Sequence, residues 1–131
     1  MTRLLLIMFA GGLGTGLRYG IHTAMRKLGD GFPFGILTVN LLGCFLAGLL
    51  GAIFLSAAHL REDFKLAIMI GFLGGLTTFS SYAFDTLELW LDQRPTAAFV
   101  NVIVNNVGCL FVVGLGYWIG SKWTGMPVVA L

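Results

Sequence analysis

Gly71-Phe72-Leu73-Gly74-Gly75-Leu76-Thr77-Thr78-Phe79-Ser80-Ser81-Tyr82 is the stretch that decides how this chain folds. It lies inside a long apolar segment, yet it gathers three glycines and four Ser or Thr residues. Each glycine costs roughly 1 kcal/mol relative to alanine in a helix, so the stretch predicts a helix break. Non-helical backbone at membrane depth is tolerated only where it is buried in protein or lines a watery cavity. The stretch therefore predicts the working part of a pore or transporter.

The distribution of charge predicts a membrane protein. The 131-residue chain is 57% hydrophobic and 11% charged, which is too apolar for an ordinary soluble domain. No Asp, Glu, Lys or Arg occurs in residues 34–58, 66–84 or 96–121, and residues 4–25 contain only Arg18. About 20 apolar residues suffice to cross the hydrocarbon core as a helix. We expect an all-α membrane protein with one four-helix domain, 1–131, and spans near 4–25, 34–58, 66–90 and 96–121, the third broken.

Basic residues are balanced between the two sides of the membrane. The side that holds the N-terminus and the middle loop has four Lys or Arg residues, and the other side has three or four. Orientation is normally set by an excess of Lys and Arg on the cytoplasmic side. The balance favours insertion in both orientations and an antiparallel, dual-topology homodimer. A partner protein or one dominant charge that fixes a single orientation remains the alternative interpretation.

Asparagine side chains mark the second and fourth spans. Asn40 lies well inside the second span, where its amide either forms an interhelical hydrogen bond or turns its NH2 group toward an anion. Both interpretations stay open. Asn101, Asn105 and Gly108 follow the i, i+4, i+7 rule and form one polar stripe. Asn106 falls off this stripe by about 100° and is interpreted as a helix–helix contact.

The third span combines aromatic rings with hydroxyl groups. Phe79 and Tyr82 are three residues apart, so they project from the same helix face. The edge of an aromatic ring is positive, and it can hold an anion without a full positive charge. Thr78, Ser80 and Ser81 add hydroxyl donors nearby. An aromatic pair at this spacing is usually core packing, and the adjacent glycines and hydroxyls favour an anion site instead.

Backbone carbonyls in the glycine-rich stretch are candidate cation ligands. A helix break would leave the carbonyls of Gly74 and Thr77 without partners, and unwound carbonyls coordinate Na⁺ in transporters. In a two-fold dimer these groups would meet their copies around one central ion.

Other reactive side chains have simpler interpretations. Cys44 and Cys109 lie in the middle of predicted spans, outside any CxxC or His/Cys cluster, and are interpreted as small packing residues. Asp85, Glu88 and Asp92 follow one another at the end of the third span and predict an acidic face at the membrane interface.

Three motifs carry a family resemblance that covers essentially the whole chain. They are Gly11-Gly12-Leu13-Gly14 leading to Arg18-Tyr19, Phe34-Gly35-Ile36-Leu37-Thr38-Val39-Asn40-Leu41-Leu42-Gly43, and Gly74-Gly75-Leu76-Thr77-Thr78-Phe79-Ser80-Ser81-Tyr82. The last motif is very similar to the GGxTTFSTF signature of the Fluc/CrcB family of fluoride ion channels. The chain resembles that family, although Tyr82 stands where the family usually has Phe.

The resemblance implies a dual-topology homodimer with two antiparallel pores that let fluoride leave the cell passively across the inner (plasma) membrane. Such efflux lowers cytoplasmic fluoride and its toxicity. The implied fluoride ligands are Asn40, Phe79 and Tyr82, with a hydroxyl track of Thr78, Ser80 and Ser81 and fourth-span positions Asn101 and Asn105. A structural Na⁺ is implied at the dimer centre, bound by the carbonyls of Gly74 and Thr77. The implied partners are fluoride, the lipid bilayer and a second copy, and neither catalysis nor nucleic acid is expected.

Two other classes of membrane protein are alternatives to a channel. A small dual-topology multidrug or cation exporter needs an acidic residue deep in the membrane. Here the first span has no acid, and the acids of the third begin only at Asp85. A membrane anchor or assembly subunit would explain the helices but not the polar stripes. The sequence therefore favours the channel over both alternatives.

Overall fold

All regular structure is helical in the part of the chain that the computed structural model describes, residues 1–26, 31–57 and 59–125. The elements are α1 (Thr2–Met25), α2 (Phe34–Ser56), α3 (Glu62–Leu66), η2 (Ala67–Phe72), α4 (Leu73–Leu76), α5 (Phe79–Leu91), α6 (Pro95–Ile103), η3 (Val104–Gly108) and α7 (Cys109–Thr124). The two η elements are π-helical turns within longer helices.

Four helical stretches are long and apolar enough to cross a membrane, as the sequence predicts. They are Thr2–Met25, Phe34–Ser56, Glu62–Leu91 and Pro95–Thr124. The predicted end of the second span at residue 58 lies outside the described residues, as do residues 126–131 of the predicted domain.

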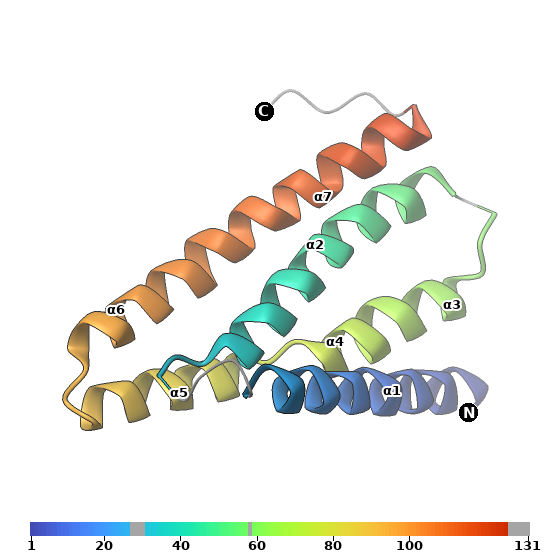
Figure 1. Cartoon of the computed structure of the whole chain (residues 1–131). Coiled ribbons are helices and arrows are strands. Elements are labelled where there is room, and N and C mark those ends of the chain that lie inside the picture. Colours follow the sequence, from blue (N-terminus) through green and yellow to red (C-terminus); the bar gives the residue numbers. More distant parts are fainter. Residues whose placement is uncertain (27–30, 58, 126–131) are drawn as a thin grey trace.

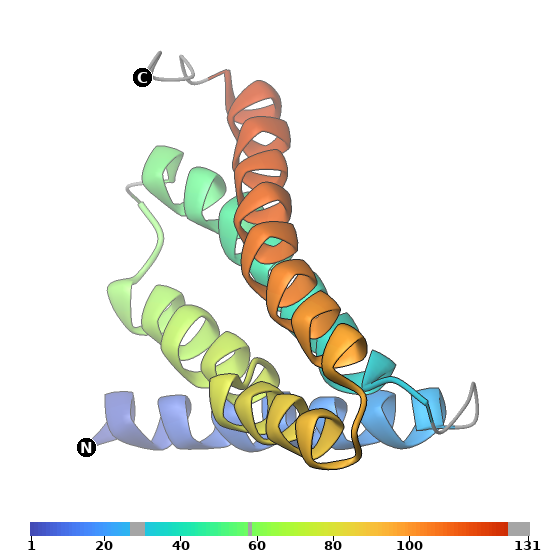
Figure 2. The ribbon, with the colours of Figure 1, turned by 90° about the vertical axis from the view of Figure 1, so that its left-hand side faces the viewer.

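The helices pack as two pairs. Figures 1 and 2 show α2 and α7 side by side, and α1 lying along the α3–α4 stretch. The α2–α7 pair is inclined to the α1–α4 pair. A small core of Val39, Leu73 and Leu76 lies where α2 meets α4.

Glycines permit close approach within both pairs. A Cβ atom on Gly14 would overlap the carbonyl oxygen of Phe72, and one on Gly48 would overlap the carbonyl oxygen of Val113. Small residues at such contacts let helix backbones pack tightly, which matters in lipid because no hydrophobic driving force holds helices together there.

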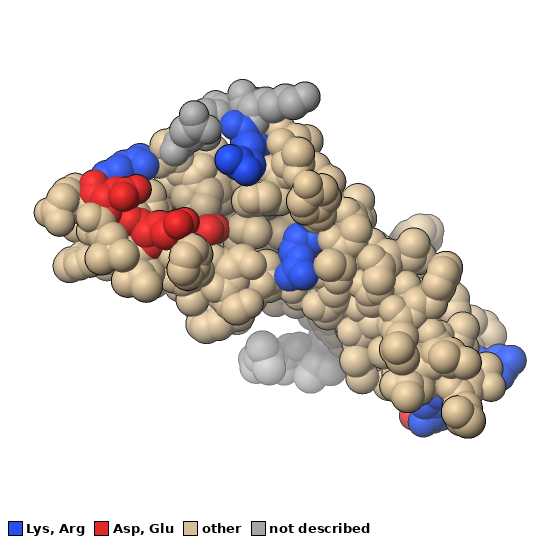
Figure 3. Space-filling view, turned by 90° about the horizontal axis from the view of Figure 1, so that it is seen from below, with Lys and Arg blue, Asp and Glu red and all other residues tan. Residues whose placement is uncertain are grey.

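Most large apolar side chains point outward, as expected for helices that contact lipid. In the most apolar part of α1, only 6% of the residues are buried inside the chain. In Figure 3 most of the acidic side chains on the visible face gather at one end, and uncharged surface covers most of that face. At the start of α1, Arg3 Nε pairs with Asp63 Oδ1 of α3 at 2.6 Å. This ion pair joins the two helices outside their apolar stretches.

Candidate functional site

Two residues with extended backbone separate α4 from α5. Thr77 has ψ 155° and Thr78 has φ −154°. The Thr78 N–H donates to Asn40 Oδ1 at 2.9 Å, and the Ser81 N–H donates to Thr78 Oγ1 at 3.2 Å. In an uninterrupted helix these two N–H groups would donate to the carbonyls of Gly74 and Thr77. Two side-chain oxygens therefore accept the hydrogen bonds that the carbonyls of Gly74 and Thr77 would accept in a continuous helix.

Asn40 fixes this segment from the neighbouring helix. Its Nδ2 donates to the Thr78 carbonyl at 3.2 Å and to Asn105 Oδ1 at 3.0 Å. The side chain is buried, and an amide without partners would be costly there. Both N–H groups are occupied, so Asn40 can donate to an ion only by giving up one of these bonds.

The amides of the fourth span continue the network. Asn105 Nδ2 donates to Asn101 Oδ1 at 2.9 Å, and Asn101 Nδ2 donates to Thr86 Oγ1 at 2.8 Å. The predicted stripe of Asn101 and Asn105 is thus brought together with Asn40. Asn101 is only 1% exposed and lies behind Asn105, where it links α6 to α5.

The two aromatic rings meet edge to face. The centroids of Phe79 and Tyr82 are 5.2 Å apart, with an interplanar angle of 68°. Phe79 is 74% exposed, whereas Tyr82 is buried. The Tyr82 hydroxyl accepts a hydrogen bond from Asn106 Nδ2 at 2.9 Å. The Phe79 ring therefore faces outward, whereas the Tyr82 side chain is hydrogen-bonded to the fourth span.

Asn106 makes the contact between helices that the sequence predicts, and it also faces the same cavity as Asn105. The sequence reasoning assumed an α-helix, in which adjacent residues point about 100° apart. Both residues lie in the π-helical turn η3, which locally changes the helical register. Because no residue pattern marks such a turn, sequence reasoning placed Asn106 off the polar stripe.

These groups border a cavity of about 350 Å³, here called the amide cavity. It is lined by Asn40, Cys44, Thr77, Thr78, Phe79, Tyr82, Asn105, Asn106, Cys109 and Leu110. None of the lining residues is charged. The amide cavity therefore offers amide, hydroxyl and ring-edge groups in a neutral setting.

The predicted serines face a different space. A cavity of about 620 Å³, here called the hydroxyl cavity, is lined by Thr15, Arg18, Tyr19, His22, Ile36, Ser80, Ser81, Phe84 and Asp85. Thr78 lines the amide cavity and contacts two residues of the hydroxyl cavity, since its Oγ1 donates to Ser81 Oγ at 3.1 Å and lies 3.3 Å from Ser80 Oγ. Most of the predicted pore residues are thus divided between two neighbouring cavities, whereas Asn101 lines neither of them.

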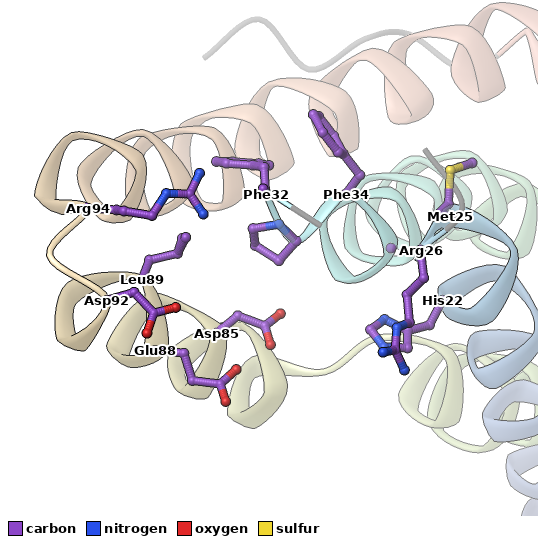
Figure 4. Close-up of a pocket in the computed structure, with 13 residues that line it drawn as sticks. His22, Met25, Arg26, Phe32, Phe34, Asp85, Glu88, Leu89, Asp92 and Arg94 are labelled. Atoms are coloured by element: carbon purple, nitrogen blue, oxygen red, sulfur yellow. The ribbon is translucent and has the colours of Figure 1, made fainter. Parts of the chain in front are cut away.

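A third cavity opens at the end of the molecule. It measures about 500 Å³ and is here called the end cavity. Figure 4 shows Asp85 and Glu88 of α5, and Asp92 directly after this helix, along one side of it, with Arg94 close by. Its wall includes His22 and Asp85, which also line the hydroxyl cavity. The acidic face predicted from the sequence therefore borders a cavity that adjoins the hydroxyl cavity.

Four membrane-length helices, with neutral polar groups gathered around an extended segment of the third, define a small multi-pass membrane protein with a neutral polar cavity. The chain belongs to the family described as CrcB-like protein, Camphor Resistance (CrcB), which matches residues 5–117. This match confirms the resemblance seen in the sequence motifs.

Curated relatives cover nearly the whole chain. One from Geobacter sp. (strain M21) is 42% identical over 117 residues, which is 88% of this chain and 94% of the relative. One from Serratia proteamaculans is 40% identical over 126 residues, 93% of this chain and 99% of the relative. One from Methylobacterium radiotolerans is 35% identical over 129 residues, 97% of this chain and 90% of the relative. All three relatives are described as the fluoride-specific ion channel FluC.

Proposed function

We propose that this chain is a fluoride-selective channel that lets fluoride leave the cell passively across the inner membrane. The description of its relatives as fluoride-specific channels supports this function. The structural observation that carries it is the amide cavity, where neutral donors from α2, α5 and η3 converge beside the extended residues Thr77 and Thr78.

Neutral donors suit the chemistry of fluoride. The ion is small and strongly hydrated, so a pore must replace its water with several short-range donors. Conduction also requires that binding stay weak enough for release. Amide N–H groups, hydroxyls and ring edges meet both needs, whereas a fixed positive charge would trap the anion. Asn40, Asn105, Phe79 and Tyr82 are the proposed contacts of the ion in this cavity.

The start of α5 adds a favourable field. The helix begins at Phe79, and Thr78 caps it by accepting the N–H of Ser81. The N-terminus of a helix carries a positive partial charge and unpaired N–H groups, which stabilise anions nearby. The interruption of the third span therefore places a favourable helix terminus between the amide cavity and the hydroxyl cavity.

The three cavities suggest the route of the ion. The end cavity and the hydroxyl cavity share His22 and Asp85, and Thr78 of the amide cavity is hydrogen-bonded to Ser81 of the hydroxyl cavity. Ser80 and Ser81 supply the hydroxyl track along this route, and Arg18 adds a positive charge that attracts anions. We assign Asn101, which is buried behind Asn105, to positioning the amides.

The proposed assembly is an antiparallel, dual-topology homodimer. Phe79 borders the amide cavity and is 74% exposed, so a single chain leaves this wall open to lipid. A second copy would cover it. A Cβ atom on Gly74 would meet no heavy atom within 4 Å, which leaves room for close approach of another helix at this position. The balance of basic residues across the membrane supports insertion in both orientations.

We propose a structural Na⁺ at the centre of this dimer, bound by the carbonyls of Gly74 and Thr77. Both carbonyls have lost their helical N–H donors to side chains, as unwound backbone that binds Na⁺ does. Arg18 Nη1 lies 3.5 Å from the Thr77 oxygen, at the outer limit of a hydrogen bond. A carbonyl oxygen has two lone pairs, so this contact leaves a position for a cation.

The exporter alternative is not favoured. Proton-coupled export of cations uses a carboxylate at the centre of the membrane. The amide cavity is lined by no carboxylate, and Asp85 lines the hydroxyl cavity and the end cavity instead. The curated relatives described above are named as fluoride channels.

Ion efflux from liposomes tests the proposed function. Purified protein is reconstituted into liposomes loaded with fluoride and chloride, and each ion is followed with its own electrode after a potassium ionophore is added. Rapid loss of fluoride with retention of chloride is expected. Efflux of neither ion, from protein shown to be folded and dimeric, would overturn the proposal.

A further inference from the structure

The two cysteines of this chain come together, although they are far apart in the sequence. Cys44 belongs to α2 and Cys109 begins α7, and both line the amide cavity. Both thiols are free and half-buried. Sequence spacing gave no sign of this pair, because it is formed by packing between helices.

Helix packing explains why they meet. Along the α2–α7 contact, Gly48 packs against the backbone of Val113, and Gly116 packs against the backbone of Phe45. Closer to the start of both helices, Gly108 lies beside Leu41. The two helices therefore run in the same direction, and this register sets residue 44 opposite the first turn of α7.

We propose that Cys44 and Cys109 form a two-sulfur binding site for a soft metal cation, with Hg²⁺ as the probe. Soft thiolate ligands select soft metals, and Hg²⁺ favours two sulfur ligands. In the binding step each thiol releases one proton, and one Hg²⁺ forms a bond to each sulfur, with no change in oxidation state. The product is neutral, which suits a cavity without charged residues.

The bound metal would also obstruct the amide cavity. Asn40 and Phe79 line the same space of about 350 Å³ as the two thiols. A mercury ion held between the sulfurs would occupy part of the volume through which an ion must pass. This consequence rests on the proposed channel function, whereas binding of the metal does not.

Metal stoichiometry tests the site directly. The full chain in detergent is titrated with Hg²⁺, and free thiols and intact mass are measured after excess β-mercaptoethanol is added. One retained mercury per chain and loss of both thiols are expected for wild type. Cys44→Ala and Cys109→Ala keep one sulfur each, so β-mercaptoethanol should remove the metal from both variants. Binding of two mercury ions per wild-type chain would overturn the proposed site. It would also be overturned if β-mercaptoethanol removed the metal equally from all three proteins, or if one mercury ion bridged two chains.

Fluoride efflux separates this proposal from the channel function. Hg²⁺ should abolish most efflux by wild type, and a dithiol should restore it. Each single-cysteine variant, compared with its own metal-free rate, should keep its efflux after Hg²⁺ and β-mercaptoethanol. Mercury retention without any metal-free efflux would support the thiol site and overturn the channel function. Mercury retention with unchanged efflux would show that the site lies outside the ion route.

Discussion

Asn40 and Thr78 are joined by two reciprocal hydrogen bonds. The Thr78 N–H donates to Asn40 Oδ1 at 2.9 Å, and Asn40 Nδ2 donates to the Thr78 carbonyl at 3.2 Å. One side chain of α2 thus accepts the hydrogen bond of the Thr78 N–H, which has no helical acceptor, and also donates to the Thr78 carbonyl. The extended segment is therefore held by a neighbouring helix as well as favoured by its own glycines.

Asn40→Asp should abolish fluoride efflux. A carboxylate has no N–H to donate, so its oxygens would face the Thr78 carbonyl and Asn105 Oδ1, and its charge would repel the anion. Loss of the two hydrogen bonds from Nδ2 should also lower stability by about 1–3 kcal/mol. Efflux and thermal unfolding are measured side by side with Asn40→Leu, which adds no charge and removes the acceptor of the Thr78 N–H as well. Undiminished fluoride efflux in Asn40→Asp would show that Asn40 is structural only.

Phe79→Ile should abolish fluoride efflux while leaving the fold intact. The ring is 74% exposed, so its removal from a single chain disturbs little packing, yet it deletes one of the two positive ring edges. Phe111→Ile is the matched control, because Phe111 is 70% exposed and lines none of the three cavities described above. Normal efflux in Phe79→Ile would remove the aromatic pair from the mechanism.

Tyr82→Phe should keep selective fluoride efflux. The substitution retains the ring edge and removes only a hydroxyl that accepts one hydrogen bond from Asn106. Asn106 keeps its bond to the Val102 carbonyl, so the expected loss of stability is about 1 kcal/mol or less. Rates are compared with those of Tyr82→Ile, which should lose efflux. Complete loss in Tyr82→Phe would identify the hydroxyl as an essential donor.

The four spans could be predicted because charge-free runs of membrane length leave few alternatives, and the structure confirms helices of that length. The division of the candidate site between two cavities could not be predicted from the sequence. Ser80 and Tyr82 are two residues apart in one helix, yet they line different cavities. Asn105 and Asn106 line the same cavity because both lie in a π-helical turn. Cys44 and Cys109 line it together because α2 packs against α7. Both are tertiary features that residue spacing does not encode.

Gly116→Ala should destabilise the protein, whereas Gly114→Ala in the same helix should not. A Cβ on Gly116 would overlap the carbonyl oxygen of Phe45, while one on Gly114 meets no heavy atom within 4 Å. Forcing α7 away from α2 should cost about 1–3 kcal/mol. The open position should gain up to about 1 kcal/mol from the better helix former. Thermal unfolding in detergent measures both, and equal melting temperatures would contradict the tight α2–α7 contact.

Gly74→Leu and Gly75→Leu should separate dimer formation from folding of the chain. A Cβ on Gly75 would overlap the carbonyl oxygen of Gly11, so Gly75→Leu should prevent α4 from packing on α1 and yield little folded protein. Gly74 faces open space within the single chain, so Gly74→Leu should fold but fail to dimerise, because its side chain fills the room left for the second copy.

Light scattering during size exclusion measures the mass of each variant. Replacing Na⁺ by N-methylglucamine should weaken the wild-type dimer in the same assay, because the carbonyls of Gly74 and Thr77 would then face one another without a cation. A Gly74→Leu protein that remains fully dimeric would place the interface elsewhere. A wild-type dimer that is indifferent to Na⁺ would remove the ion from the proposed assembly while leaving the fluoride route through the amide cavity untouched.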